Sequence, residues 1–129
     1  AFSSVGLPGD TGCIYHLKQI VGLAKTIELM ALSPRIHGKE ALQLGLATRL
    51  APDGKLEEET NAFAAKLLRR PLSALAMQKQ LYYEVFYHDY MAYSRLEAEN
   101  LGKAGASADH REAVTAFLEG RKPQFNQKN

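Results

Sequence analysis

The chain has 129 residues and 46% apolar content, so it is long enough for one modest domain and too short for two well-separated ones. Its net charge is +2, with 16 basic and 14 acidic residues interleaved, which argues against a nucleic-acid-binding surface. The single cysteine, Cys13, excludes an internal disulfide, and no apolar run is long enough to span a membrane. We expect a cytoplasmic protein, or one of the mitochondrial or peroxisomal matrix if the source is eukaryotic, with no nucleic-acid or membrane partner.

The chain opens with a predicted strand over residues 1–5, a glycine-rich turn over residues 6–9, and a helix predicted over residues 11–20. Asp10 is the single acid between the turn and this helix. Its carboxylate can be the N-cap of the helix, accepting hydrogen bonds from the free N–H groups of the first turn. It can instead be a catalytic base, because glycines allow the turn to approach a ligand closely. The local pattern favours the cap, since caps are common, and leaves the base open.

Gly22 is expected to end or kink the first helix, and a second helix is predicted over residues 23–32. The second helix carries an apolar stripe made of Leu23, Ile27 and Met30. Ser33 and Pro34 are expected to stop it. No other His, Cys or acid stands at a metal-ligand spacing from His16, so the sequence predicts no metal site.

The middle of the chain is predicted to be a short helix over residues 38–44, a short strand over residues 47–51, and a long amphipathic helix that begins after Pro52. Asp53 is the expected cap of that long helix. The acids Glu57 to Glu59 fall in its first turns, where the helix dipole stabilises negative charge. Pro71 separates this helix from the next one.

An aromatic segment over residues 72–105 is predicted to be one long helix or two consecutive ones. Two stripes lie about 100° apart on such a helix, one formed by Tyr82, Phe86, Tyr90 and Tyr93, the other by Tyr83, Tyr87 and Met91. The pattern is compatible with core packing, and equally with contact to another subunit, where tyrosine is enriched.

The C-terminal part is predicted to contain a loop of small residues over 101–108 and a last helix through Leu118, capped by Ser107 or Asp109. Gly120 is expected to end this helix. Residues 121–125 then form a basic tail with one aromatic residue.

Two runs of sequence resemble one family. Residues 6–52, GLPGDTGCIYHLKQIVGLAKTIELMALSPRIHGKEALQLGLATRLAP, resemble the middle of an enoyl-CoA hydratase/isomerase (crotonase) chain, and residues 109–125, DHREAVTAFLEGRKPQF, resemble its close. The resemblance covers only the C-terminal half of a family member. It implies a mostly α chain with one or two short strands, the C-terminal part of the ClpP/crotonase-like α/β fold. Residues 1–52 would be the end of the catalytic core, and residues 53–129 a helical oligomerisation region that builds a homotrimer or a higher homo-oligomer.

The resemblance also implies an acyl-CoA substrate, with coenzyme A as part of the substrate and no separate cofactor. It places Leu7, Pro8 and Gly9 against the substrate. It places Phe117 and Lys122 at the nucleotide end of coenzyme A, where an aromatic ring can lie on adenine and a cation matches phosphate.

The resemblance further bears on the reaction. Hydratases of this family use two glutamates; the first would lie before residue 1, and the second falls at Phe2, which cannot transfer a proton. Asp10 falls where members that move a double bond carry an acid, so Asp10 is the expected catalytic residue of an isomerase. A hydratase (lyase) and a purely structural helical oligomerisation module remain the alternatives. The backbone N–H groups that stabilise the enolate would also precede residue 1, so the chain is expected to be nearly inactive alone.

Overall fold

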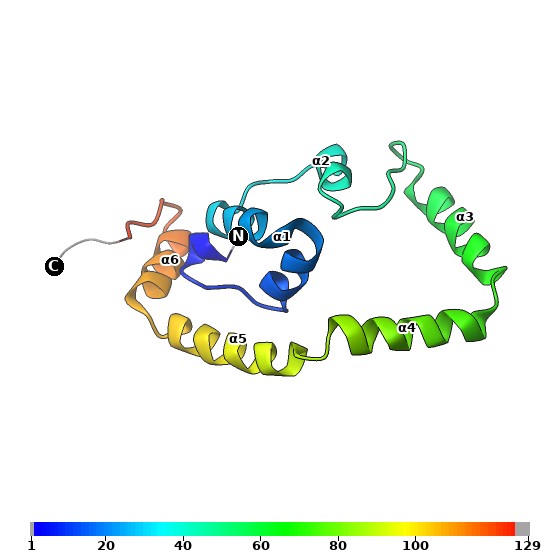
Figure 1. Ribbon diagram of the computed structural model, residues 1–129. Coiled ribbons are helices and arrows are strands. Elements are labelled where there is room, and N and C mark those ends of the chain that lie inside the picture. Colours follow the sequence, from blue (N-terminus) through cyan, green and yellow to red (C-terminus); the bar gives the residue numbers. More distant parts are fainter. Residues whose placement is uncertain (1, 126–129) are drawn as a thin grey trace.

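A computed structural model describes residues 2–125, and this part of the chain is built from helices (Figure 1). The elements are η1 (Ser3–Val5), α1 (Cys13–Leu32), α2 (Gly38–Gln43), α3 (Leu56–Leu68), α4 (Leu72–Phe86), α5 (Tyr90–Gly105) and α6 (Ala108–Leu118). The predicted mostly helical fold is confirmed. None of these helices has both the length and the apolar character that crossing a bilayer requires.

Neither predicted strand forms within residues 2–125. Ser3–Val5 is a single 3-10 turn, residues 47–51 have no regular structure, and Ala1 lies outside the described residues. A strand requires a neighbouring strand to pair its N–H and C=O groups, and the described part of the chain offers none.

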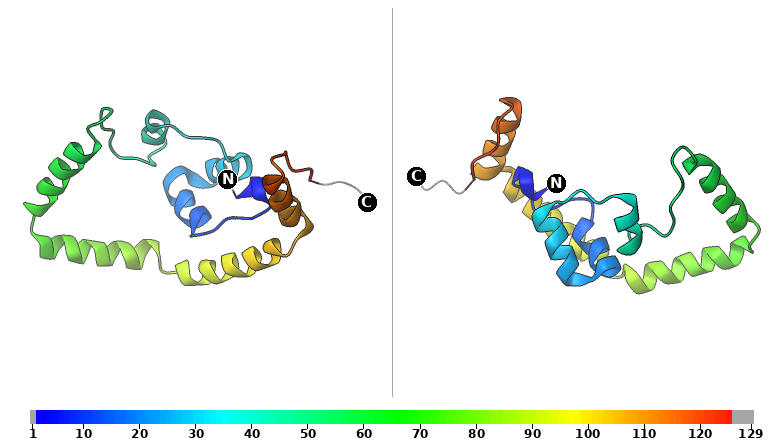
Figure 2. Two further views of the ribbon diagram at one scale, coloured as in Figure 1. Left: turned by 180° about the vertical axis from the view of Figure 1, so that it is seen from behind. Right: turned by 90° about the horizontal axis from the view of Figure 1, so that it is seen from above.

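The helices form a packed group and an open arm. Figures 1 and 2 show η1, α1, α5 and α6 close together, while α3 and α4 extend away from them. No residue of α3 or α4 is buried. The large apolar side chains of α4 that face solvent are 52% to 66% exposed, and they are Leu72, Met77, Leu81, Tyr82, Tyr83, Val85 and Phe86. The arm is therefore apolar and uncovered in the single chain.

Helix α1 is kinked, as the sequence predicted. Gly22 has φ +75° and ψ 168°, values outside the helical range, and Thr26 Oγ1 donates a hydrogen bond to the Gly22 carbonyl at 2.8 Å. The helix ends at Ser33, whose φ is +48°, directly before Pro34. Both the kink and the stop are confirmed.

The apolar stripe predicted on the second half of α1 lies on one face, but that face is open. Leu23 and Ile27 are 62% and 59% exposed and, with Met30, border a shallow groove of about 310 Å³. The buried residues of α1 are instead Tyr15, Thr26 and Leu29. The groove continues to the N-terminal turn at residues 7–8. The stripe therefore faces this turn and not the core.

One helix start and one helix end differ from their predictions. Lys55, not Asp53, is the N-cap of α3, because the helix begins beyond Gly54, and the Asp53 side chain is too far back to cap it. Helix α5 continues through the small residues as far as Gly105, where a loop was predicted. Leu101, Lys103 and Ala104 are strong helix formers and offset the unfavourable helix propensity of Gly102, which explains the continuation. Ser107 caps α6, as predicted, by accepting a hydrogen bond from the His110 N–H at 3.1 Å.

The aromatic segment forms two helices, α4 and α5, with a break at residues 87–89. The break ends the two continuous stripes predicted for a single helix. Tyr87, Tyr90 and Tyr93 pack around the buried Tyr15 ring, with centroids 6.0, 5.1 and 5.3 Å away. The aromatic residues before the break stay exposed. Some of the aromatic side chains of this segment therefore pack around Tyr15, and the others lie exposed on the open arm.

Helix α6 closes the packed group over η1. Its buried residues are Ala113 and Ala116, and Ala116 has no exposed surface. His110 Nδ1 donates a hydrogen bond to the Val5 carbonyl at 2.8 Å. Gly6 permits this approach, since a Cβ built there would lie 2.9 Å from the His110 amide nitrogen.

Candidate active site

The turn before α1 has an unusual backbone. Gly9, Thr11 and Gly12 have φ values of +142°, +58° and +76°. The left-handed region is rare for a β-branched residue such as Thr11, and its cost is normally met only where the surrounding structure imposes it. Gly9 and Gly12 are buried. The turn thus combines one strained residue, Thr11, with two buried glycines.

Asp10 lies in this turn but does not cap α1. The N-cap is Gly12, and no side chain caps the helix. Asp10 Oδ1 accepts a hydrogen bond from the adjacent Thr11 N–H at 2.6 Å, and its carbonyl accepts from Thr11 Oγ1 and from the Cys13 N–H. The carboxylate is half-buried and makes no ion pair within residues 2–125. The interpretation of Asp10 as a helix cap is therefore wrong.

Two hollows flank the turn. Pro8 and Gly9 border an almost wholly apolar cavity of about 160 Å³, whose other walls are Ile14 of α1 and Tyr93, Leu96, Glu97 and Asn100 of α5. Leu7 and Pro8 border the open groove along α1. The three predicted substrate contacts therefore line hollows, whereas Asp10 lines neither of the two.

A network of acids and tyrosines joins the start of α1 to α5 and to the break before it. Glu97 accepts hydrogen bonds from the Gly12 N–H at 2.9 Å and from Tyr93 Oη at 2.6 Å. Tyr15 Oη contacts Asp89 Oδ1 at 2.5 Å and the Phe86 carbonyl at 2.7 Å. Glu97 was not among the residues predicted from the sequence, because 85 residues separate it from Gly12. The only available signal was the i, i+4 spacing of Tyr93 and Glu97.

The network shifts the pKa values of its members. Burial, with the hydrogen bond to Asp89, raises the pKa of Tyr15 to about 12. The Tyr15 hydrogen bond holds the pKa of the Asp89 carboxyl below its usual range. Burial and the Glu97 carboxylate raise the pKa of Tyr93. The two tyrosines therefore remain hydrogen-bond donors to a higher pH than a tyrosine in water would.

The predicted coenzyme A contacts lie at the end of α6. Phe117 is 83% exposed and Lys122 is also exposed. The tail that carries Lys122 is held by Arg121, which pairs with Glu112 at 2.5 Å and with Glu119 at 2.7 Å. Glu112 also accepts a hydrogen bond from the Gln124 N–H at 2.9 Å. Within the described residues, no hydrogen bond or ring contact joins Phe117 or Lys122 to the Asp10 turn.

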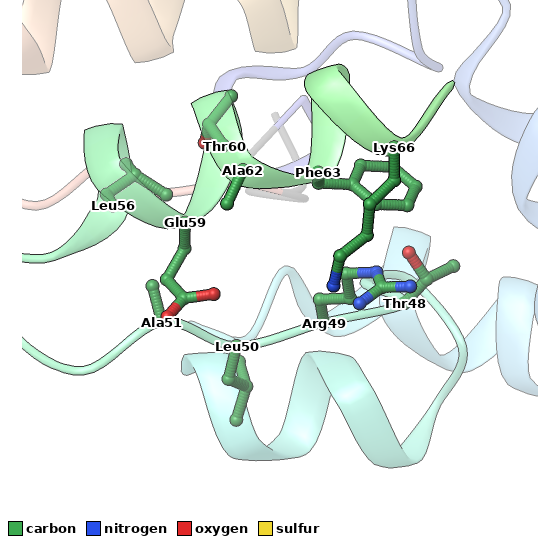
Figure 3. Close-up of a pocket in the computed structure, with 10 residues that line it drawn as sticks. All are labelled: Thr48, Arg49, Leu50, Ala51, Leu56, Glu59, Thr60, Ala62, Phe63 and Lys66. Atoms are coloured by element: carbon green, nitrogen blue, oxygen red, sulfur yellow. The ribbon is translucent and has the colours of Figure 1, made fainter. Parts of the chain in front are cut away.

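A larger hollow lies elsewhere, between α3 and residues 48–51 (Figure 3). Its volume is about 460 Å³, and the Arg49 guanidinium carbon lies 4.2 Å from the centre of the Phe63 ring. Figure 3 shows Arg49 and Lys66 reaching toward the end where Phe63 lies, and Glu59 toward the other end. None of the site residues predicted from the sequence borders it.

The family model for enoyl-CoA hydratase/isomerase matches residues 1–128, nearly the whole chain. The chain belongs to the enoyl-CoA hydratase/isomerase family. Within this family the match covers the C-terminal half, as the two sequence runs predicted.

Relatives in the enoyl-CoA hydratase/isomerase family include proteins described by different reactions. A probable enoyl-CoA hydratase of Rhodobacter capsulatus is 37% identical over 125 residues, 97% of this chain and 49% of the relative. A 1,2-epoxyphenylacetyl-CoA isomerase of Escherichia coli is 31% identical over 128 residues, 99% of this chain and 49% of the relative. The chain thus spans about half the length of the curated relatives it matches.

The fold of this half is also found in a solved member of the family. The crystal structure of an enoyl-CoA hydratase from Mycobacterium avium subsp. paratuberculosis superimposes with a TM-score of 0.88 at 30% identity, covering 98% of this chain and 52% of that one. The helical arrangement of this chain is therefore that of the corresponding half of an enoyl-CoA hydratase.

Proposed function

We propose that this chain carries the acid/base turn of an acyl-CoA-processing enzyme that isomerises the double bond of an enoyl-CoA. The observation that carries the proposal is Asp10 itself: a half-buried carboxylate on a strained turn that neither caps α1 nor pairs with a cation in the described residues. Strained backbone clusters at functional sites, and a helix cap would not require it.

The proposed chemistry is a 1,3-proton shift. The Asp10 carboxylate removes a proton from the carbon next to the thioester of a 3-enoyl-CoA, and the electron pair passes into the thioester as an enolate. The same group returns the proton to the fourth carbon, so that the double bond moves from C3–C4 to C2–C3. One acid completes this cycle with no net change of its own protonation.

Hydration is the second candidate reaction, because the Rhodobacter capsulatus relative is a probable hydratase. Against it stands Phe2, which occupies the position where the resemblance places the second catalytic glutamate of a hydratase. The Phe2 side chain has no acidic proton, and its carbonyl is already bonded to the N–H groups of Val5 and Leu7. A purely structural role would leave the strain at Thr11 unexplained.

The test is Asp10→Asn in the complete gene product, with Asp53→Asn as the matched control on an exposed turn. Asparagine keeps an oxygen that accepts from the Thr11 N–H, so the turn should hold its shape. Conversion of a 3-enoyl-CoA, followed by the absorbance of the conjugated product, should fall at least about a hundredfold with little change in thermal midpoint. If Asp10→Asn turns over as fast as Asp53→Asn, Asp10 is not the catalytic base.

The coenzyme A contacts are part of the same proposal. Phe117 is an exposed ring and Lys122 a cation on a tail that Arg121 and Glu112 hold in place. Lys122→Ala should raise the KM for the CoA thioester and leave kcat nearly unchanged, because the nucleotide end is remote from the reacting carbons. Lys103→Ala, on the exposed face of α5, is the control.

The apolar arm is proposed to pack against further copies of the same chain, as a homotrimer or a higher homo-oligomer. The exposed apolar side chains of α4 would be covered in such an assembly. Sedimentation velocity at micromolar concentration should therefore find a species of at least three chains. A clean monomer under these conditions would contradict this part of the proposal.

A further inference from the structure

Glu97 of α5 reaches across to the start of α1. One carboxylate oxygen, Oε2, accepts the Gly12 N–H at 2.9 Å, and the other, Oε1, accepts the Tyr93 hydroxyl at 2.6 Å. Both oxygens are thus engaged, and the side chain is half-buried. A bond between a carboxylate and a backbone N–H is stronger than one between neutral groups.

The Gly12 amide lies at the start of α1, in backbone with positive φ. Gly12 is the N-cap of α1, where no side chain of the helix's own first turn serves as a cap. Its φ of +76° comes directly after the +58° of Thr11, so two successive residues are held in the left-handed region. The left-handed backbone of Thr11 is costly and persists where the surroundings over-determine it. Glu97 holds the amide that directly follows Thr11.

Side chains of successive turns of α5 surround the same point. Tyr90 lies so close to Gly12 that a Cβ there would be 2.9 Å from the Tyr90 hydroxyl. Tyr93 donates to Glu97 and fixes its carboxylate. Burial and the negative charge of Glu97 raise the pKa of Tyr93, which keeps this donor protonated. Helix α5 therefore sets the orientation of the turn from the outside.

We infer that Glu97 is a positioning residue that holds the Gly12 amide, and through it the Asp10 turn, in the orientation that proton transfer requires. The inference rests on the proposed role of Asp10, which lies two residues before Gly12. Glu97 borders the apolar cavity beside Pro8 and Gly9, so it also lies near the proposed substrate. Each of its oxygens already accepts a hydrogen bond from the protein, so its carboxylate is held on Gly12 and Tyr93.

The experiment compares Glu97→Ala, Glu97→Gln and the control Glu99→Ala, an exposed acid on the same helix, in the complete gene product. Glu97→Ala should lower kcat about 10- to 100-fold with little change in KM, since small misplacements of a reacting group are this costly. Glu97→Gln keeps an oxygen that accepts the Gly12 N–H and should stay within about threefold of the unsubstituted protein. The Gly12 amide should exchange its hydrogen faster in the alanine variant only.

The results of these variants distinguish a positioning role of Glu97 from a role in proton transfer. A Glu97→Ala kcat equal to that of Glu99→Ala overturns the inference. A Glu97→Gln kcat as low as that of Asp10→Asn also overturns it, because Glu97 would then carry the proton itself. If Glu97→Ala does not fold, Glu97→Asp replaces it, because the shorter side chain withdraws the carboxylate from the Gly12 N–H. A lower kcat with faster exchange of the Gly12 amide then supports the inference, and a kcat equal to that of Glu99→Ala overturns it. Failure of the proposed function is seen separately, as full turnover in Asp10→Asn.

Discussion

Gly12 gives a sharp test of how closely α5 approaches the turn. Its φ is +76°, a conformation that costs an L side chain about 1–2 kcal/mol. A Cβ at this position would also meet the Tyr90 hydroxyl at 2.9 Å and His16 Cδ2 at 3.1 Å. Forcing a methyl group into such a space costs about a further 1–3 kcal/mol. We therefore expect Gly12→Ala to lower the free energy of unfolding by about 2–5 kcal/mol.

Gly54 is the matched control, because its φ is also +76° and a Cβ there would meet nothing within 4 Å. Gly54→Ala should carry only the backbone cost of about 1–2 kcal/mol. Urea unfolding followed by circular dichroism, at one fixed protein concentration, should separate the two midpoints by roughly 1 M. If the two variants unfold within about 0.5 kcal/mol of each other, Tyr90 does not constrain the turn.

Two further predictions concern α6 and its tail. Ser107→Ala removes the oxygen that accepts the His110 N–H and should cost about 1 kcal/mol in thermal or urea unfolding, whereas no loss would mean that the cap is not used. The Arg121 guanidinium and the Gln124 N–H lower the pKa of Glu112 to about 2, so the stabilisation from these contacts is complete above the ordinary carboxyl pKa and is lost as the pH falls toward 2. An NMR titration of the Gln124 amide should have its midpoint near this low value, and a midpoint near 4 would contradict the contact.

The local features of the chain were predictable from the sequence. Gly22 kinks α1, Ser33 and Pro34 stop it, and Ser107 caps α6. Each depends on the conformational preference or the hydrogen-bonding capacity of a few adjacent residues, which act over one helical turn. The family itself was predictable from motifs in consecutive residues, and the comparison over residues 1–128 confirms it.

The strands and the helix starts were harder to predict. The segments at residues 1–5 and 47–51 have the composition of strands, yet within residues 2–125 they find no partner with which to pair. Asp10 and Asp53 look like helix caps, yet α1 begins at Cys13 and α3 at Leu56, beyond glycines with positive φ. Glycine permits a left-handed backbone, and its use is decided by the contacts of the whole chain.

The sequence alone thus determined the helices, the family and Asp10 as a candidate, since these depend on periodicity and on residues that are neighbours along the chain. Only the tertiary structure placed Glu97 against Gly12 and divided the aromatic residues between the Tyr15 cluster and the open arm. These contacts join residues 71 to 85 positions apart, and no local pattern encodes which distant side chain will satisfy a given N–H group. The physical reason is that a buried polar group requires a partner, while the fold decides where that partner is found.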